Sequence, residues 1–189
     1  MSTKATTTRK SKTYDIVYIG IFAVLIAICS WISIPTMVPF TLQTFAVFLA
    51  VSVLGGKRGS LAVFVYVLLG AIGVPVFANF TGGFGIILNN TGGYIIGFIF
   101  SALVMWLMEK LLGRKTWVQG LSMILGLFVC YIFGTAWFMF VYTQNTGAIG
   151  LTTVLGWCVI PFLIPDFVKI GLALALGGRL SKIIKIDND

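Results

Sequence analysis

The chain has 189 residues, of which 59% are hydrophobic and only 10% are charged. A soluble domain carries about 25% charged residues, so this composition excludes a soluble protein and predicts an integral membrane protein with little mass outside the bilayer. The sequence has no histidine, which excludes imidazole metal ligands and histidine-based acid–base catalysis.

Membrane-spanning segments are expected to be helical, because the strict alternation of apolar and polar residues that barrel strands need is absent. At roughly 20 residues per span, the length allows about six transmembrane helices. The expected helices, in chain order, are residues 15–34, 41–54, 60–72, 92–112, 117–142 and 165–178. We therefore predict an all-α integral membrane protein with a six-helix domain over residues 15–186.

The segments between these helices differ in character. A basic tail, residues 1–14, precedes the first helix, and we expect residues 1–12 of it to be disordered. A short tail, residues 187–189, follows the helical domain at the C-terminus. Pro35 and Pro39 end the first helix and hold residues 34–40 extended. Long uncharged connections follow at residues 74–91 and 143–164, and the second has room for a short helix.

The basic residues predict the topology. With six spans, twelve of the thirteen Lys and Arg residues fall on one side of the membrane: Lys4, Arg9, Lys10, Lys12, Lys57, Arg58, Lys110, Arg114, Lys115, Arg179, Lys182 and Lys185. The three connections on the other side carry none. The positive-inside rule then places both termini in the cytoplasm, and it explains the net charge of +8 without a nucleic-acid partner.

The remaining base, Lys169, stands three residues after Asp166, which is the one acidic residue within the apolar part of the chain. Residues three apart share a helix face. A charged side chain costs roughly 2.5–3.5 kcal/mol at the centre of a membrane helix, so a retained pair indicates a binding function near the outer face. A purely structural ion pair at the start of a helix is the alternative.

Neutral polar and aromatic residues collect in the same outer half of the chain. Gln43 and Asn79 are candidates for a polar shell around a ligand, and the candidates for its apolar wall are Phe77, Tyr94, Trp137 and Tyr142. Trp137 and Tyr142 also suit the membrane–water interface. Such a lining favours a small, partly apolar ligand that is rich in hydrogen-bonding groups, and it does not suit phosphate, which calls for more Arg and Lys.

Ala23 and Ala27 stand four residues apart in the first helix. Small residues at this spacing allow another helix to approach closely, either a partner subunit or a neighbour within the bundle. No nucleotide-binding loop occurs anywhere in the sequence, so the chain carries no visible means of using ATP.

Four motifs in order resemble the BioY family, the biotin-specific substrate-capture (S) components of energy-coupling-factor (ECF) transporters, over nearly the whole chain. They are Pro39-Phe40-Thr41-Leu42-Gln43-Thr44, the run from Leu69 to Ala78, Thr91-Gly92-Gly93-Tyr94 with Gly97-Phe98, and Pro165-Asp166 with Lys169. The resemblance implies a six-helix S-component fold that binds biotin with high affinity near the outer face, beneath the loop between the first two helices. The protein would lie in the bacterial cytoplasmic membrane as a multi-pass subunit for biotin uptake.

The resemblance also implies partners and roles. The partners are a transmembrane coupling subunit, docked through Ala23 and Ala27, and two ABC ATPase subunits. The ureido group of biotin has two N–H donors and one carbonyl, beside an apolar ring and chain and a carboxylate. Asp166 would accept a ureido N–H, and Lys169 would donate to the carbonyl or meet the carboxylate. No cofactor is expected besides the biotin ligand.

Three alternatives stay open at this point. The chain can be an S component for another vitamin, such as thiamine or riboflavin. It can be a stand-alone secondary transporter that uses Asp166 and Lys169 as a proton relay. An intramembrane enzyme has the weakest case, because the sequence has no histidine and no serine- or cysteine-based catalytic arrangement.

Overall fold

The computed structural model describes residues 3–36 and 38–183, with side chains from residue 13 to residue 182. Over these residues the chain is mostly helical. The long helices are α1 (Thr3–Trp31), α2 (Gln43–Leu54), α3 (Gly56–Ala71), α5 (Gly92–Leu112), α6 (Thr116–Asn145) and α8 (Ile160–Ile183). Shorter elements are the strands β1 (Ser33–Ile34) and β2 (Phe40–Thr41), the 3-10 turn η1 (Ala78–Phe80), α4 (Phe84–Leu88) and α7 (Leu151–Cys158).

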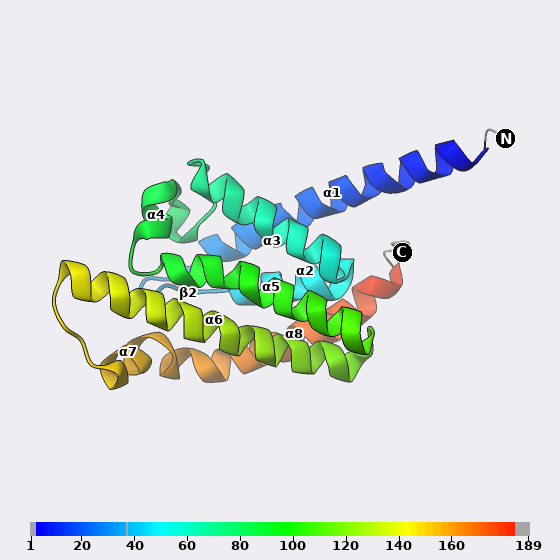
Figure 1. Ribbon diagram of the computed structural model, residues 1–189. Helices are drawn as coiled ribbons and strands as arrows, with labels where there is room; N and C mark the ends of the chain where they lie inside the picture. Colours follow the sequence, from blue (N-terminus) through cyan, green and yellow to red (C-terminus); the bar gives the residue numbers. More distant parts are fainter. Residues whose placement is uncertain (1–2, 37, 184–189) are drawn as a thin grey trace.

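The long helices run side by side, and the connections collect at the two ends of the bundle (Figure 1). At one end, which we call the basic end, α1 begins, α8 ends, and the α2–α3 and α5–α6 connections turn. At the opposite end, which we call the cavity end, lie the β1–β2 hairpin, α4 and α7. Ser33 pairs with Thr41 and Ile34 with Phe40 in this antiparallel hairpin.

Several boundaries differ from those expected. Residues 3–12 are helical, as a continuation of α1, so the expectation of a disordered tail is wrong for them. The α3 helix begins at Gly56 rather than near residue 60, and α8 begins at Ile160 rather than at Pro165. Proline is well tolerated in the first turn of a helix, and Pro161 occupies that turn of α8, which leaves Pro165 inside the helix. The short helix expected within residues 143–164 is present as α7.

Four helical segments of the described chain are long and apolar enough to cross a membrane: Thr13–Trp31, Gly92–Leu112, Thr116–Asn145 and Leu151–Lys182. The apolar helix α2 has 12 residues, and at 1.5 Å per residue it extends only about 18 Å. Length and composition therefore support a helical, multi-pass membrane protein, and the six-span count remains a prediction.

Glycines bring α5 and α6 into close contact. A Cβ atom placed on Gly93 would lie 2.2 Å from Cβ of Trp137, and one on Gly134 would lie 2.2 Å from Cδ1 of Tyr94. Both distances are far shorter than any real carbon–carbon contact. Because these two glycines have no side chain, Trp137 of α6 packs directly against α5 and Tyr94 of α5 packs directly against α6. Small residues allow close approach at membrane helix interfaces in general.

At the basic end, charged side chains cap the junction between α2 and α3. Arg114 donates from Nη2 to the carbonyl oxygens of Ser52 at 2.6 Å and Val53 at 2.7 Å, where the last carbonyls of α2 lack intrahelical partners. Oε2 of Glu109 accepts from the backbone N–H of Gly56 at 2.9 Å, at the start of α3. Each charge has the sign that the dipole of its helix end favours.

Replacing Arg114 with methionine is expected to lower the free energy of unfolding by about 1–3 kcal/mol, because two carbonyls at the end of α2 lose a charged donor. Thermal unfolding in detergent measures the change. Lys115→Met is the matched control, because that lysine is the exposed neighbour in the same connection. Equal stability of the two variants would contradict the capping role.

Ala23 and Ala27 lie inside the bundle, with only 2% and 4% of their surfaces exposed. They belong to the same buried cluster as Ile26, Tyr66 and Phe48. The expectation that this pair forms a docking surface for a partner is wrong for this arrangement, because the face that carries it is already covered by the chain's own helices. Close packing within the bundle is the role that their spacing serves here.

Candidate functional site

A cavity of about 230 Å³ lies between the helices at the cavity end. This is slightly below the range of about 300–1,000 Å³ that is usual for drug-sized ligands, so the site suits one small molecule. The lining side chains that can form hydrogen bonds are Thr41, Gln43, Thr44, Asn79, Thr81, Asn89, Thr91, Tyr94, Tyr131, Asp166 and Lys169, together with the thiols of Cys130 and Cys158. Asn79 and Asn89 are exposed, so the cavity reaches the surface of the bundle.

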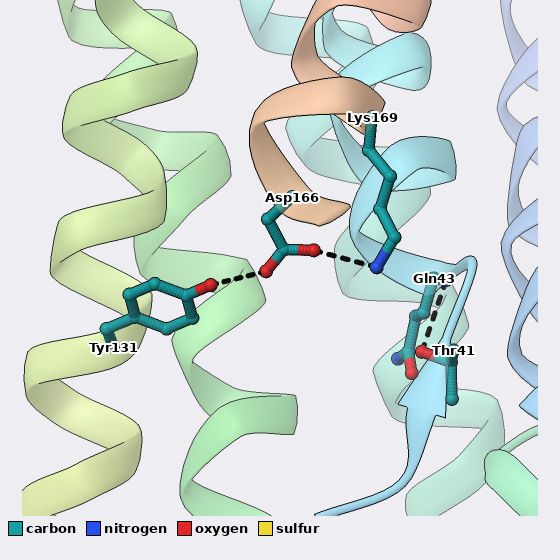
Figure 2. Close-up of polar contacts among 5 residues, drawn as sticks. All are labelled: Thr41, Gln43, Tyr131, Asp166 and Lys169. Atoms are coloured by element: carbon teal, nitrogen blue, oxygen red, sulfur yellow. Dashed lines mark hydrogen bonds and ion pairs between the residues drawn. The ribbon is translucent and has the colours of Figure 1, made fainter. Parts of the chain in front are cut away.

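The expected acid–base pair lies in this cavity. Nζ of Lys169 is 2.7 Å from Oδ1 of Asp166, and the two residues are only 4% and 2% exposed. The hydroxyl of Tyr131, on α6, donates to Oδ2 of Asp166 at 2.5 Å. Figure 2 shows the carboxylate between these two partners. Both carboxylate oxygens are therefore engaged, and each keeps lone pairs for a further donor.

An aromatic ring completes the surroundings of the lysine. Nζ of Lys169 lies 4.5 Å from the centroid of the Phe40 ring, which is a cation–π distance. Phe40 belongs to strand β2 and stacks on Phe162 of α8, with 5.5 Å between ring centroids. The β1–β2 hairpin thus contributes directly to the environment of the charged pair.

Gln43 lies in the cavity with its amide orientation fixed. Its Nε2 donates to the hydroxyl of Tyr66 at 2.8 Å, and its backbone N–H donates to Oγ1 of Thr41 at 3.2 Å. Figure 2 shows Lys169 extending from α8 toward this part of the chain. With Nε2 engaged by Tyr66, the carbonyl oxygen of the Gln43 side chain is left as the acceptor.

Asn79 is held by strand β1, which follows the first helix. Its Oδ1 accepts from the hydroxyl of Ser33 at 2.9 Å, so its two N–H donors remain for a ligand. Asn79 and Phe80 both adopt the left-handed conformation, with φ of 58° and 56°, which is unusual for a bulky residue such as phenylalanine. The Phe80 ring stacks on Trp31, whose Nε1 donates to the carbonyl of Pro75 at 3.0 Å.

Phe77 and Tyr94 form apolar walls, as expected. Phe77 meets Tyr66 edge to face, with ring centroids 5.7 Å apart, and it occupies the space beside Gly70. Tyr94 fills the space beside Gly134, and its hydroxyl lies 3.2 Å from Oγ1 of Thr135. Both aromatic residues are at least nine-tenths buried.

Trp137 and Tyr142 are not among the residues that line the cavity. Trp137 packs against Gly93 and donates from Nε1 to the carbonyl of Asn89 at 3.0 Å, so it supports a lining residue from outside. Tyr142 stacks on Phe138 and meets Trp157 edge to face. The structure therefore does not place these two rings in the wall of the cavity: Trp137 lies about 120° around α6 from the lining residue Tyr131, and Tyr142 lies about three turns further along the helix.

The lining residues that the sequence reasoning missed include Tyr131, Phe162 and Cys158. Tyr131 lies in the middle of a long apolar helix, where a tyrosine is ordinarily core filler. The available signal was helical spacing, because Tyr131 lies three residues before Gly134 and on the same face of α6. No local pattern, however, predicts which distant carboxylate that face meets.

The BioY family model matches residues 1–186 of the chain. The chain belongs to the BioY family. It is 42% identical to the Biotin transporter BioY of Thermotoga maritima over 165 residues, which cover 87% of this chain and 94% of that protein. It is 39% identical to the Probable biotin transporter BioY of Pyrococcus horikoshii over 171 residues, which cover 89% of this chain and 97% of that protein.

A solved structure supports the fold of this BioY protein. The crystal structure at 2.1 Å of the S-component for biotin from an ECF-type ABC transporter matches with a TM-score of 0.81 and 26% sequence identity. The match covers 92% of this chain and 93% of that one. The chain therefore has the S-component fold, and with its apolar helices it is a multi-pass protein of the cell membrane.

Proposed function

We propose that this BioY protein binds biotin with high affinity in the cavity around Asp166 and Lys169, and that it is the substrate-specific subunit of an ECF-type transporter for biotin uptake. The observation that carries the proposal is the buried pair, which lines a cavity of small-molecule size in a chain whose relatives are named as biotin transporters. Those names denote transport, and no catalytic activity is proposed.

The donors and acceptors of the cavity suit a ureido group. In a cyclic urea each N–H donor stands next to the carbonyl acceptor. The cavity offers the complementary arrangement, because the carboxylate acceptor of Asp166 and the ammonium donor of Lys169 lie 2.7 Å apart. We assign a ureido N–H to Asp166 and the ureido carbonyl to Lys169. Charge-assisted bonds of this kind contribute about 1.5–3 kcal/mol each. The N–H donors of Asn79 and the free oxygen of Gln43 extend this polar shell.

The apolar parts of biotin would lie against the aromatic walls. Phe77 and Tyr94 present buried ring surface to the cavity, and Phe98, Leu127 and Ile95 add aliphatic and aromatic area to the same lining. Burial of apolar surface contributes roughly 25 cal/mol per Å². The combination of a charged pair with apolar walls therefore matches a ligand that has one polar ring edge and a hydrocarbon body.

We further propose that all six long helices cross the membrane, within a substrate-binding unit over residues 15–186, and that both termini are cytoplasmic. The support is the grouping of basic residues at the basic end. The α2–α3 and α5–α6 connections turn there, and α8 ends there; the basic residues in or beside these two connections are Lys57, Arg58, Lys110, Arg114 and Lys115. The positive-inside rule assigns such an end to the cytoplasm. The cavity end would then face outward.

The energy for uptake would come from partners: a transmembrane coupling subunit and two ABC ATPase subunits. The chain has no nucleotide-binding loop, in keeping with an external energy source. The docking surface must lie on residues other than Ala23 and Ala27, because these two are buried. Co-purification of the chain with a coupling subunit and ATPases, followed by ATP-dependent biotin uptake in proteoliposomes, tests this assignment.

Titration of the purified chain with biotin by calorimetry tests the binding function directly. We expect tight binding with one biotin per chain, in the absence of any partner and in the presence of a metal chelator. Thiamine and riboflavin serve as controls and should neither bind nor compete. Binding of one of these vitamins in place of biotin would keep the fold and overturn the substrate.

A further inference from the structure

We propose that Tyr131 is a positioning residue for the ligand site, which fixes the carboxylate of Asp166 in the orientation that the ligand meets. The inference rests on the proposed binding function, and it adds a residue that affects ligand binding by holding Asp166 in place. The carrying observation is the hydrogen bond from the Tyr131 hydroxyl to Oδ2 of Asp166, inside the cavity.

The two partners of the carboxylate differ in what they can fix. Lys169 lies on the same helix as Asp166, three residues further on, so this ion pair moves with α8 as a unit. Tyr131 belongs to α6, so its bond fixes the carboxylate relative to another wall of the cavity (Figure 2). The tyrosine bond is therefore the one that joins the orientation of Asp166 to the rest of the site.

The tyrosine is itself well placed to hold a partner. It is 8% exposed, and Asp166 is 2% exposed, so solvent competes weakly for the bond between them. A hydroxyl that donates to a carboxylate forms a short and strong bond, and the distance of 2.5 Å agrees with one. A tyrosine side chain also has few rotatable bonds, so the position of α6 largely determines the position of the hydroxyl.

The same helix holds a second lining residue in place. Gly134 and Thr135, one turn after Tyr131, receive the ring and the hydroxyl of Tyr94. α6 thus supports two lining residues that come from other helices, Asp166 of α8 and Tyr94 of α5. A carboxylate without the tyrosine bond keeps its charge and its lysine but gains freedom to rotate, and the ligand must then order it on binding.

The test is a double-mutant cycle on biotin affinity between Tyr131→Phe and Asp166→Asn, measured by calorimetry on the full chain. We expect Tyr131→Phe to weaken binding about five- to twentyfold in the wild-type background. In the Asp166→Asn background the same change should weaken binding less than about twofold, because the charged acceptor is gone. Tyr18→Phe, a partly buried tyrosine of α1 that does not line the cavity, should leave affinity unchanged.

The outcomes separate the two proposals. If the wild-type chain does not bind biotin, the proposed function fails and the inference fails with it. If the wild type binds, and Tyr131→Phe either binds equally well or weakens affinity by the same factor in both backgrounds, only the positioning role is overturned. Equal loss in both backgrounds is the result that a general packing role of the tyrosine produces.

Discussion

Lys169→Met is expected to weaken biotin binding at least tenfold. The substitution removes the ammonium donor that we assign to the ureido carbonyl, and it leaves the buried carboxylate of Asp166 without its cation. Removing one member of a buried pair destabilises a protein by about 3–5 kcal/mol, because the remaining charge is uncompensated. Calorimetric titration gives the affinity, and thermal unfolding in detergent gives the stability.

A paired replacement separates binding from folding. Asp166→Asn combined with Lys169→Met removes both charges, so we expect much of the lost stability to return while biotin binding stays weak. Lys57→Met, at an exposed lysine of the basic end, is the matched control for loss of one positive charge and should change neither quantity. Wild-type affinity in Lys169→Met would return the pair to a purely structural role.

Gly134→Ala should have the second large effect, on stability and affinity together. The added Cβ would lie 2.2 Å from Cδ1 of Tyr94, so either the ring or one of the two helices must move. Overpacking of this kind costs about 1–3 kcal/mol. Because Tyr94 lines the cavity, its displacement should also weaken biotin binding severalfold, as measured by the same titration.

The control for this experiment lies on the same helix. A Cβ on Gly120 would meet Cδ1 of Leu174 at 3.4 Å, which is an ordinary contact distance. Gly120→Ala should therefore leave stability near the wild-type value or raise it slightly, since alanine favours helix. If Gly134→Ala matched Gly120→Ala in both stability and affinity, the close approach of α5 and α6 would not position Tyr94.

The sequence alone predicted the features that depend on composition and local chemistry. Helices form where long apolar runs occur, and Asp166 and Lys169, the one acid and the one base away from the expected cytoplasmic side, were identified as a pair. Their contact is local, three residues apart on one helix, so spacing was enough to place them together. Gln43, Asn79, Phe77 and Tyr94 also line the cavity as expected.

The features that sequence reasoning missed are those set by how helices rotate against one another. Tyr131 reaches Asp166 across 35 positions of sequence, and no local pattern encodes that meeting. Trp137 lies on the same helix but about 120° around it from Tyr131, and Tyr142 lies on nearly the same face as Tyr131 but about three turns further along α6. The small-residue spacing of Ala23 and Ala27 correctly indicated close packing, but it did not say which helix would be the neighbour.

The Asp166–Lys169 pair also has an electrical consequence. Moving one elementary charge across a membrane potential of 100 mV involves about 2.3 kcal/mol of work. The two opposite charges lie 2.7 Å apart within a single turn of α8, so they carry no net charge when that helix shifts within the field. Any dependence of biotin uptake on membrane voltage would then arise from the negative charge of the ligand and not from its binding site.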